Sequence, residues 1–373
     1  MRIPIIPEHP DGPIDPIKGR GTAWRVAHRF SKDSRENFDD GWGPGEPQGE
    51  DDDFASAQPP RTQVREEHVK SILSANDSPD VPFELSINPY RGCEHGCIYC
   101  FARPTHSYLN LSPGLDFETQ IVAKVNAADC LEVELGRRGY KPSPINIGSA
   151  TDAYQPVERD LGITRRVIEV LERCEHPYTL VTKSAGVERD IDLIAASAAR
   201  TQAAVFMTVT TLDNRLSRVL EPRATAPQRR LQAVRRMADA GIPVGVNVAP
   251  IIPFVNEPEI EHIVEAAAQA GAASIHYTVV RLPWEVAPLF KHWLEQHFPQ
   301  RAERVMARIQ EMRGGRDYDA DFRTRMRGEG LWADLIRQRI DKATARHGLV
   351  RRSIALDSTR FRAPSQAGQA SLF

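Results

Sequence analysis

The sequence lacks a hydrophobic run long enough to cross a lipid bilayer. Its most apolar stretch, Ile242 to Val255, is too short for a membrane span and is interrupted by Pro250 and Pro253. Nothing in the sequence resembles a secretory signal. We therefore expect a cytoplasmic protein with no membrane partner.

Net charge is also nearly absent. The chain of 373 residues carries 48 Lys+Arg and 50 Asp+Glu, which leaves a net charge of -2. A balance this even argues neither for nor against a nucleic-acid partner. The composition, 41% hydrophobic and 26% charged, is typical of a folded protein with one large core or two ordinary ones.

Cysteine is scarce, and an odd number of cysteines without a secretory signal disfavours a disulfide scaffold. Three of the five cysteines nevertheless lie together, because Cys93, Cys97 and Cys100 form a C-x3-C-x2-C array. Thiolates this close in sequence can meet at one metal centre only if the backbone between them curls. Gly92 and Gly96 allow that, since a residue without Cβ can take a positive φ.

Three thiolates leave one coordination position open. A structural zinc site normally has four protein ligands, whereas a cubane iron-sulfur cluster on three cysteines keeps one iron free for chemistry. A zinc site with His95 or His106 as the fourth ligand is the alternative. His95 lies between two of the cysteines and would have to fold back to join them.

The stretch N-P-Y-R-G-C-E-H-G-C-I-Y-C-F-A-R-P-T-H, with Tyr99 just before the last cysteine, carries a family likeness. It resembles the cluster loop of the radical S-adenosylmethionine (SAM) superfamily, in the branch that contains spore photoproduct lyase. The resemblance extends from about Ser71 to about Pro283.

This resemblance implies that Cys93, Cys97 and Cys100 hold a [4Fe-4S] cluster whose open iron chelates the amino and carboxylate groups of SAM. Tyr99 would pack beside the cluster or the adenine. Reductive cleavage of SAM would give a 5′-deoxyadenosyl radical that takes a hydrogen atom from a substrate. A one-electron reductant of the flavodoxin or ferredoxin type is implied as a partner.

Strand-like and helix-like stretches alternate through most of the chain. Aliphatic and β-branched runs predict strands near 84–89, 144–149, 178–182, 204–210, 243–249 and 274–280. Helices are predicted near 117–137, 162–174, 188–199, 227–240 and 258–270. Alternating units predict an α/β fold with a parallel sheet, and the resemblance implies an open, partial six-stranded TIM barrel.

Local signals locate several helix ends. Asp116 and Thr164 are predicted N-caps, and Gly241 and Gly271 are predicted to end helices. The stretch Val64 to Leu73 is predicted to be helical.

The chain divides into three predicted regions. Residues 1–62 are rich in Pro, Gly and acids and are expected to be largely disordered. Trp24, Val26 and Phe30 could dock on the folded body as an arm, or their segment could be an unstructured basic patch. Residues 63–283 form the partial barrel, and residues 284–373 form a helical C-terminal extension with a flexible tail. Residues 301–362 carry 16 Lys+Arg against 9 Asp+Glu, which suits either a phosphate backbone or a solvated helix face.

Polar residues follow the second and third predicted strands, where a barrel places its chemistry. Ser149, Thr151 and Asp152 follow the second strand, and the resemblance assigns them to the SAM amino group; alternatively, Asp152 only caps the next turn. Lys183 and Ser184 follow the third strand. The Lys183 ammonium suits the SAM carboxylate, unless it is an ordinary surface lysine.

Later segments offer weaker candidates. Arg223 either contacts an anion at the barrel mouth or pairs with Glu221. Arg281 follows the sixth predicted strand. His276 is a lone histidine in a strand, which is more often a core residue than a catalyst.

The substrate stays open at this stage. Spore photoproduct lyase uses a further active-site cysteine as hydrogen-atom donor, whereas the loop after the second predicted strand has none, and Cys130 and Cys174 fall on predicted helices. Three functions remain: radical chemistry on a nucleic acid, whose target base would have to leave the stack; radical modification of a peptide or small metabolite; and metal binding without catalysis. The sequence does not specify the oligomeric state.

Overall fold

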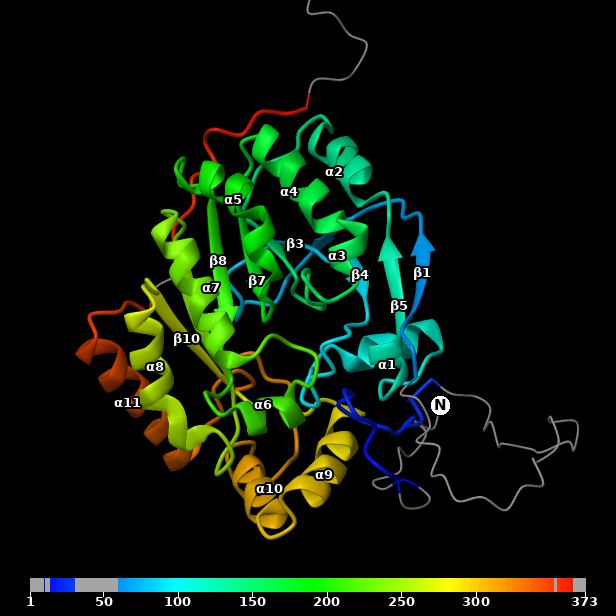
Figure 1. Ribbon diagram of the computed structural model, residues 1–373, viewed down its shortest axis with the longest axis vertical. Coiled ribbons are helices and arrows are strands. Elements are labelled where there is room, and N and C mark those ends of the chain that lie inside the picture. The colour runs from blue at the N-terminus through cyan, green and yellow to red at the C-terminus, as the bar shows by residue number, and fades with distance from the viewer. Residues whose placement is uncertain (1–9, 11–13, 31–59, 352–353, 365–373) are drawn as a thin grey trace, which may run out of the picture.

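The computed structural model describes residue 10 and residues 14–30, 60–351 and 354–364 (Figure 1). Most of the disorder predicted for residues 1–62, and the end of the predicted flexible tail, lie outside these residues. The division into three regions remains a prediction.

A seven-stranded sheet in the order β10-β9-β8-β7-β6-β3-β2 forms the centre of the fold. Its parallel strands are β3 (Leu85–Ile87), β6 (Ile145–Ile147), β7 (Tyr178–Thr182), β8 (Ala203–Thr208), β9 (Val244–Ile251) and β10 (Ser274–Val279). β2 (Leu73–Ala75) adds to β3 in the antiparallel sense. All six predicted strands are confirmed. No pairing between β10 and β3 closes the sheet in the described part of the chain, which agrees with a partial barrel.

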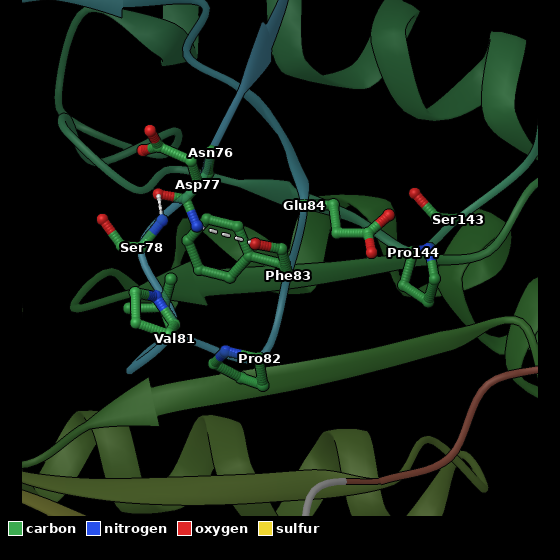
Figure 2. Close-up of a pocket in the computed structure, with 10 residues that line it drawn as sticks. Asn76, Asp77, Ser78, Val81, Pro82, Phe83, Glu84, Ser143 and Pro144 are labelled. Atoms are coloured by element: carbon green, nitrogen blue, oxygen red, sulfur yellow. Dashed lines mark hydrogen bonds between the residues drawn. The ribbon is translucent and has the colours of Figure 1, made fainter.

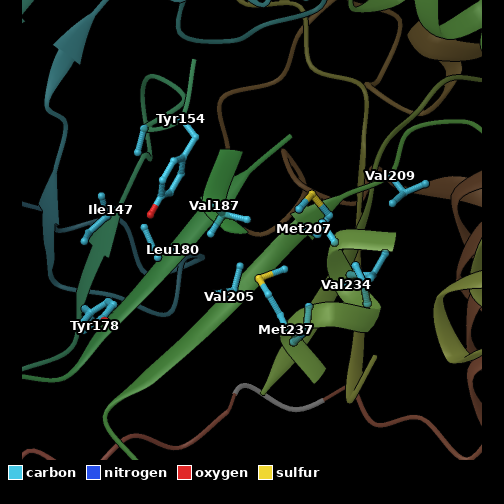
Figure 3. Packing of buried hydrophobic residues seen from close by; sticks show 14 of the residues in the cluster. Ile147, Tyr154, Tyr178, Leu180, Val187, Val205, Met207, Val209, Val234 and Met237 are labelled. Atoms are coloured by element: carbon cyan, nitrogen blue, oxygen red, sulfur yellow. The ribbon is translucent and has the colours of Figure 1, made fainter. Parts of the chain in front are cut away.

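The register of the parallel strands pairs Ile87 of β3 with Ile147 of β6, and Ile147 with Leu180 of β7. Figure 3 shows the core that results, in which Leu180 and Val205 come from neighbouring strands and Met237 packs beside Val205. Because every strand of a parallel sheet points the same way, the residues after each strand gather at one end of the barrel.

Helices cover the outer face of this sheet. They are α3 (Glu158–Leu161), α4 (Ile163–Arg173), α5 (Ile191–Ala198), α7 (Pro227–Asp239) and α8 (Ile260–Gln269), with 3-10 helices η2 (Ala185–Asp190) and η3 (Glu257–Glu259). α6 (Asn214–Leu220) packs instead in a second buried cluster, through Leu216 and Leu220, with Ile98 and Trp293. Gly241 and Gly271 follow α7 and α8 with φ of 77° and 89°, which confirms the predicted helix ends.

The predicted helix over 117–137 is wrong in its first half. α1 (Asp116–Thr119) is followed by the strand β5 (Gln120–Lys124), and only then does α2 (Ala127–Leu135) begin. β5 pairs with β1 (Gln63–Glu67) and β4 (Tyr90–Arg91), so the predicted helix over Val64 to Leu73 is also wrong. Strand pairing with distant segments overrides the local helical preference here.

The two predicted N-caps are wrong as well. α1 begins after Leu115, and the Asp116 carboxylate accepts the Ser112 N–H instead at 3.0 Å. α4 begins after Gly162, which takes a left-handed φ of 61°. The Thr164 hydroxyl, inside the first turn, donates to the Ala153 carbonyl at 2.6 Å.

The C-terminal extension is helical, as predicted, with α9 (Val286–His297), α10 (Ala302–Glu311) and α11 (Gly330–Arg346). Arg339 connects α11 to η3 and α8 through ion pairs with Glu257 and Glu261, respectively. Much of the positive charge of this region is matched by its own carboxylates, as in the pairs Arg323 with Asp321 and Arg337 with Asp334.

Part of the N-terminal arm docks on the body, as predicted. Trp24 and Val26 are 6% and 1% exposed, whereas Phe30 is 46% exposed. In Figure 1 this dark-blue segment lies beside α1 and α9. Among the described helices, none is long and apolar enough to span a membrane.

Candidate functional site

The three cysteines lie on one curled loop, residues 92–102, which we call the cysteine loop. Gly92 and Gly96 have φ of 81° and 68°, as their predicted role requires. A Cβ on Gly92 would lie 2.9 Å from the Phe117 carbonyl oxygen, and one on Gly96 would lie 2.7 Å from the Glu118 carboxylate. Neither position can accept a side chain without moving the loop.

Cys93 and Cys97 are buried, and Cys100 is partly exposed. Burial raises the pKa of the Cys93 thiol, and the Asp152 carboxylate and the other two thiols raise it further. Burial also raises the pKa of Cys97, to about 12, although Lys183 opposes this. These thiols therefore stay protonated until a metal centre displaces their protons.

The zinc alternative can be compared with this geometry. Within the described ranges, no three side chains of His, Cys, Asp or Glu are placed to hold a single metal ion. His106 Nε2 lies 2.9 Å from the Gln120 carbonyl oxygen, while its Nδ1 is buried with no hydrogen-bond partner among the described residues. A cluster makes a different demand, because each cysteine binds a separate iron.

A buried ion pair fixes the cysteine loop from behind. Arg103 and Glu118 are both 0% exposed and lie 2.5 Å apart. Arg103 also donates from Nε to the Cys97 carbonyl at 2.9 Å and from Nη1 to the Gly114 carbonyl at 2.9 Å. The pair thus connects the loop to α1.

The N-terminal arm belongs to the same assembly. The Gly21 N–H donates to Glu118 Oε2 at 2.8 Å, and the Leu115 N–H donates to the Trp24 carbonyl at 3.0 Å. A Cβ on Gly21 would lie only 1.8 Å from the Gly96 carbonyl oxygen. The arm and the cysteine loop therefore meet backbone to backbone.

Asp152 lies at the end of β6, between the cysteine loop and β7. Its carboxylate accepts the Thr182 hydroxyl and the Lys183 N–H, each at 2.7 Å, and lies 3.3 Å from His95 Nδ1. Burial alone would raise the pKa of Asp152, but His95 and these hydrogen bonds hold it well below its usual range. The predicted capping role is present too, since Oδ1 accepts the Tyr154 N–H at 2.9 Å.

The other hydroxyl groups of the predicted SAM set bond within the chain. Thr151 donates to the Gly92 carbonyl at 2.6 Å and so ties β6 to the cysteine loop. Ser149 accepts the Asn88 amide at 3.0 Å. Ser184 caps η2 by accepting the Gly186 N–H at 3.0 Å.

Lys183 is the charged group of this set that no carboxylate holds. Among the residues that the structure describes, none forms a hydrogen bond or ion pair with its ammonium, which lies 5.8 Å from the centre of the Tyr99 ring. Burial lowers the pKa of Lys183, but Cys97 and Glu221 outweigh burial and raise it. A charged, unpaired ammonium beside Cys97 can take an anionic ligand.

Tyr99 is anchored by a network that sequence reasoning missed. Its hydroxyl contacts Glu221 and lies 3.3 Å from the Thr210 hydroxyl, and Glu221 forms a buried ion pair with Arg230. Arg230 also donates to the Thr208 carbonyl at 3.0 Å. The one residue of this network that the sequence analysis named is Glu221, as a possible partner of Arg223.

One of the two roles predicted for Arg223 is wrong, because Arg223 pairs with Glu94 of the cysteine loop at 3.1 Å and not with Glu221. The anion contact at the barrel mouth stays a prediction. Arg223 lines a cavity of about 530 Å³ at the carboxyl ends of the strands, together with His95, Ser184, Gly186, Thr225 and Arg229. Two of its lining residues are tied to the predicted SAM set: Ser184 belongs to it, and His95 contacts Asp152.

A second hollow, of about 520 Å³, lies elsewhere (Figure 2). Its lining comes from Asn76 to Glu84 and from Ser143 and Pro144, just before β3 and β6 begin. It therefore sits at the amino ends of the strands, opposite the candidate site. A barrel places stability rather than chemistry there.

Several weaker candidates stay away from the site. His276 packs edge-on against Phe206 with ring centres 5.4 Å apart, as a core histidine would. Cys130 on α2 donates to the Val69 carbonyl at 3.1 Å, and Cys174 is buried at the end of α4. Neither cysteine is among the residues that follow a strand of the barrel.

Comparison with known proteins agrees with this geometry. Residues 87–267 match the model of the radical SAM superfamily. An uncharacterized protein of Mycobacterium tuberculosis is 34% identical over 226 residues, which cover 60% of this chain and 66% of that protein. An uncharacterized protein of Methanocaldococcus jannaschii is 27% identical over 217 residues, covering 58% of this chain and 77% of that protein.

A solved structure also shares the fold. Spore photoproduct lyase complexed with dinucleoside spore photoproduct superposes with a TM-score of 0.51 and 17% identity, over 76% of this chain and 79% of that chain. This likeness supports the partial barrel predicted from the sequence.

Proposed function

Because residues 87–267 form a domain of the radical SAM superfamily, we propose that this protein is an enzyme that reductively cleaves SAM at a [4Fe-4S] cluster. The observation that carries the proposal is the cysteine loop, which gathers Cys93, Cys97 and Cys100 beside the unpaired ammonium of Lys183. The loop offers three thiols, and its histidine, His95, lies with Nδ1 3.3 Å from the Asp152 carboxylate. Three cysteine ligands fit a cluster with one open iron.

The donor set fits both the cluster and SAM. Cys93, Cys97 and Cys100 would hold the cluster. When bound, the cluster supplies the electron that splits SAM into methionine and a 5′-deoxyadenosyl radical. The reductant we propose is a flavodoxin- or ferredoxin-type protein.

The chain's own residues bind and orient SAM in this proposal. Lys183 pairs with the SAM carboxylate, since its ammonium is charged and has no carboxylate partner. Asp152 stays ionised because its pKa is depressed, and its negative charge attracts the SAM ammonium. Ser149, Thr151 and Ser184 lie at the strand ends that carry these two charges. Tyr99, whose ring centre is 5.8 Å from the Lys183 ammonium, packs beside the cluster or the adenine.

The substrate we propose is a nucleic acid. The support is the likeness of the cysteine loop to the spore photoproduct lyase branch and the shared barrel, whose solved relative is complexed with a dinucleoside photoproduct. A second candidate, a peptide or small metabolite, is favoured by one observation. No cysteine stands between Gly148 and Glu158, so the hydrogen-donor cysteine of that relative has no counterpart in this loop.

Metal analysis and a SAM-cleavage assay test the proposal. The protein is purified without oxygen and assayed with dithionite, beside a Cys93→Ala, Cys97→Ala, Cys100→Ala triple variant and a Cys130→Ala control. We expect about four irons per chain and 5′-deoxyadenosine from the parent and the control, but not from the triple variant. Bound zinc, or an intact cluster that never cleaves SAM, would overturn the proposal.

A further inference from the structure

Exposed aromatic side chains gather around the partly exposed end of the cysteine loop. In the part of the chain that the structure describes, the exposed aromatic residues are Phe30, Phe101, Tyr108, Trp284 and Phe322, at 44 to 70% exposure. Each has an arginine guanidinium over its ring. We call these five residues the aromatic surface.

Three segments far apart in the sequence meet at Arg29. Its guanidinium carbon lies 4.1 Å from the ring centre of Trp284, 4.8 Å from that of Phe30 and 5.8 Å from that of Tyr108. The rings of Phe30 and Tyr108 are themselves 5.2 Å apart. The arm, the 3-10 helix η1 (Arg103–Leu109) and the loop after β10 thus build one face.

This face borders the candidate site. Phe101 directly follows Cys100, and the Arg281 guanidinium carbon lies 4.4 Å from the Phe101 ring centre. Arg281 follows β10, at the same end of the barrel as the other strand-end residues. Burial lowers its pKa, and the surrounding charges include Tyr318, Arg325, Asp80 and Cys100.

Two of the three arginines that lie over the rings of the aromatic surface form ion pairs with carboxylates. Arg29 contacts both oxygens of the buried Glu285 carboxylate, and Arg325 pairs with Asp80. Arg281 forms no hydrogen bond or ion pair with any residue that the structure describes. Among the described residues, the face therefore offers ring surfaces and one cation without an ion-pair partner, Arg281, rather than a broad positive field.

We propose that the aromatic surface binds single-stranded nucleic acid, with unstacked bases on its exposed rings and a phosphate on Arg281. Aromatic rings stack on any base, and a guanidinium over a ring strengthens such a site. An acidic redox protein fits less well, because Arg29 and Arg325 are already neutralised and attract little negative charge. The inference rests on the proposed function for its nucleic-acid substrate, and it adds where that substrate is held.

Fluorescence anisotropy tests this with the cluster-loaded protein and a labelled oligothymidylate of about twelve nucleotides, without SAM or reductant. We expect Trp284→Ala and Tyr108→Ala each to weaken binding by about tenfold, and a duplex of equal length to bind less tightly. The matched control is Val133→Ala, an exposed side chain of α2, a helix at the top of Figure 1, whereas the arm and α9 lie in its lower half. Retained iron and an unchanged denaturation midpoint verify that each variant is folded.

Salt dependence gives a second readout. One phosphate on Arg281 predicts only about a threefold loss of affinity when salt rises about fourfold, and Arg281→Gln should remove most of that loss. Losses in Trp284→Ala no larger than in Val133→Ala, or a steep salt dependence that Arg281→Gln leaves unchanged, would overturn the inference. So would competition by flavodoxin for this face without any oligonucleotide binding. If the protein binds the oligonucleotide through the aromatic surface but never cleaves SAM, the proposed function is refuted and the inference about this surface stands.

Discussion

Replacing Glu118 by glutamine removes the charge that holds the cysteine loop, α1 and the arm together. Glu118 and Arg103 are fully buried, and the second carboxylate oxygen accepts the Gly21 N–H. Glu118→Gln keeps the shape but leaves the Arg103 guanidinium buried without a counter-charge, and it sets an amide donor against another donor. Breaking a buried pair in this way costs about 3–5 kcal/mol. That is a large share of the roughly 5–15 kcal/mol that stabilises a typical domain.

Anaerobic denaturation with urea, followed by circular dichroism, measures this cost. The matched control is Glu311→Gln, whose partner Arg308 is 29% exposed while Glu311 is 50% exposed. A surface pair of that kind contributes less than about 1 kcal/mol. Iron retention should fall in Glu118→Gln as well, because Arg103 holds the Cys97 carbonyl. If Glu118→Gln costs no more than the control, the buried pair does not hold the loop and the reasoning fails.

Three further outcomes follow from the site. Gly21→Ala should lose iron faster than Gly136→Ala, since its Cβ would lie 1.8 Å from the Gly96 carbonyl oxygen; equal iron loss would contradict this contact. Burial lowers the pKa of His106 to about 4, below the unfolded value of about 6.5. Between pH of about 4 and 6.5 the unfolded state therefore binds more protons than the folded state. Urea titrations should show that the free energy of unfolding falls as the pH drops from about 6.5 to 4, and that it falls less in His106→Gln. Lys183→Met should weaken SAM binding by at least about tenfold in equilibrium dialysis, and unchanged affinity would exclude the proposed carboxylate contact.

Sequence patterns predicted the features that depend on a residue's own conformation. Gly92 and Gly96 take the positive φ that a curled cysteine loop needs, and the six aliphatic runs became the six parallel strands. In these cases backbone sterics or β-branching decide the outcome locally.

Features that depend on distant partners were not predicted. β5 carries residues that also suit a helix, and it becomes a strand because Gln120 pairs beside Gln63, from another part of the chain. Similarly, Tyr99 contacts Glu221, 122 positions away, and Thr210, 111 positions away. No local pattern records such contacts, which arise only when the barrel brings the strand ends together.

The cap predictions failed for a related reason. Asp116 and Thr164 are good capping residues in isolation, yet their side chains bond to Ser112 and Ala153 instead. Side chains of this type offer the backbone several competing partners, and tertiary packing chooses among them.

Electron paramagnetic resonance of the dithionite-reduced protein, with and without SAM, tests the central claim most directly. If Cys93, Cys97 and Cys100 hold a cluster with one open iron, the reduced protein gives an iron-sulfur signal whose shape changes when SAM is added. The triple cysteine variant should give no such signal. Zinc in place of iron, or an iron-sulfur signal that SAM leaves unchanged, would contradict the account.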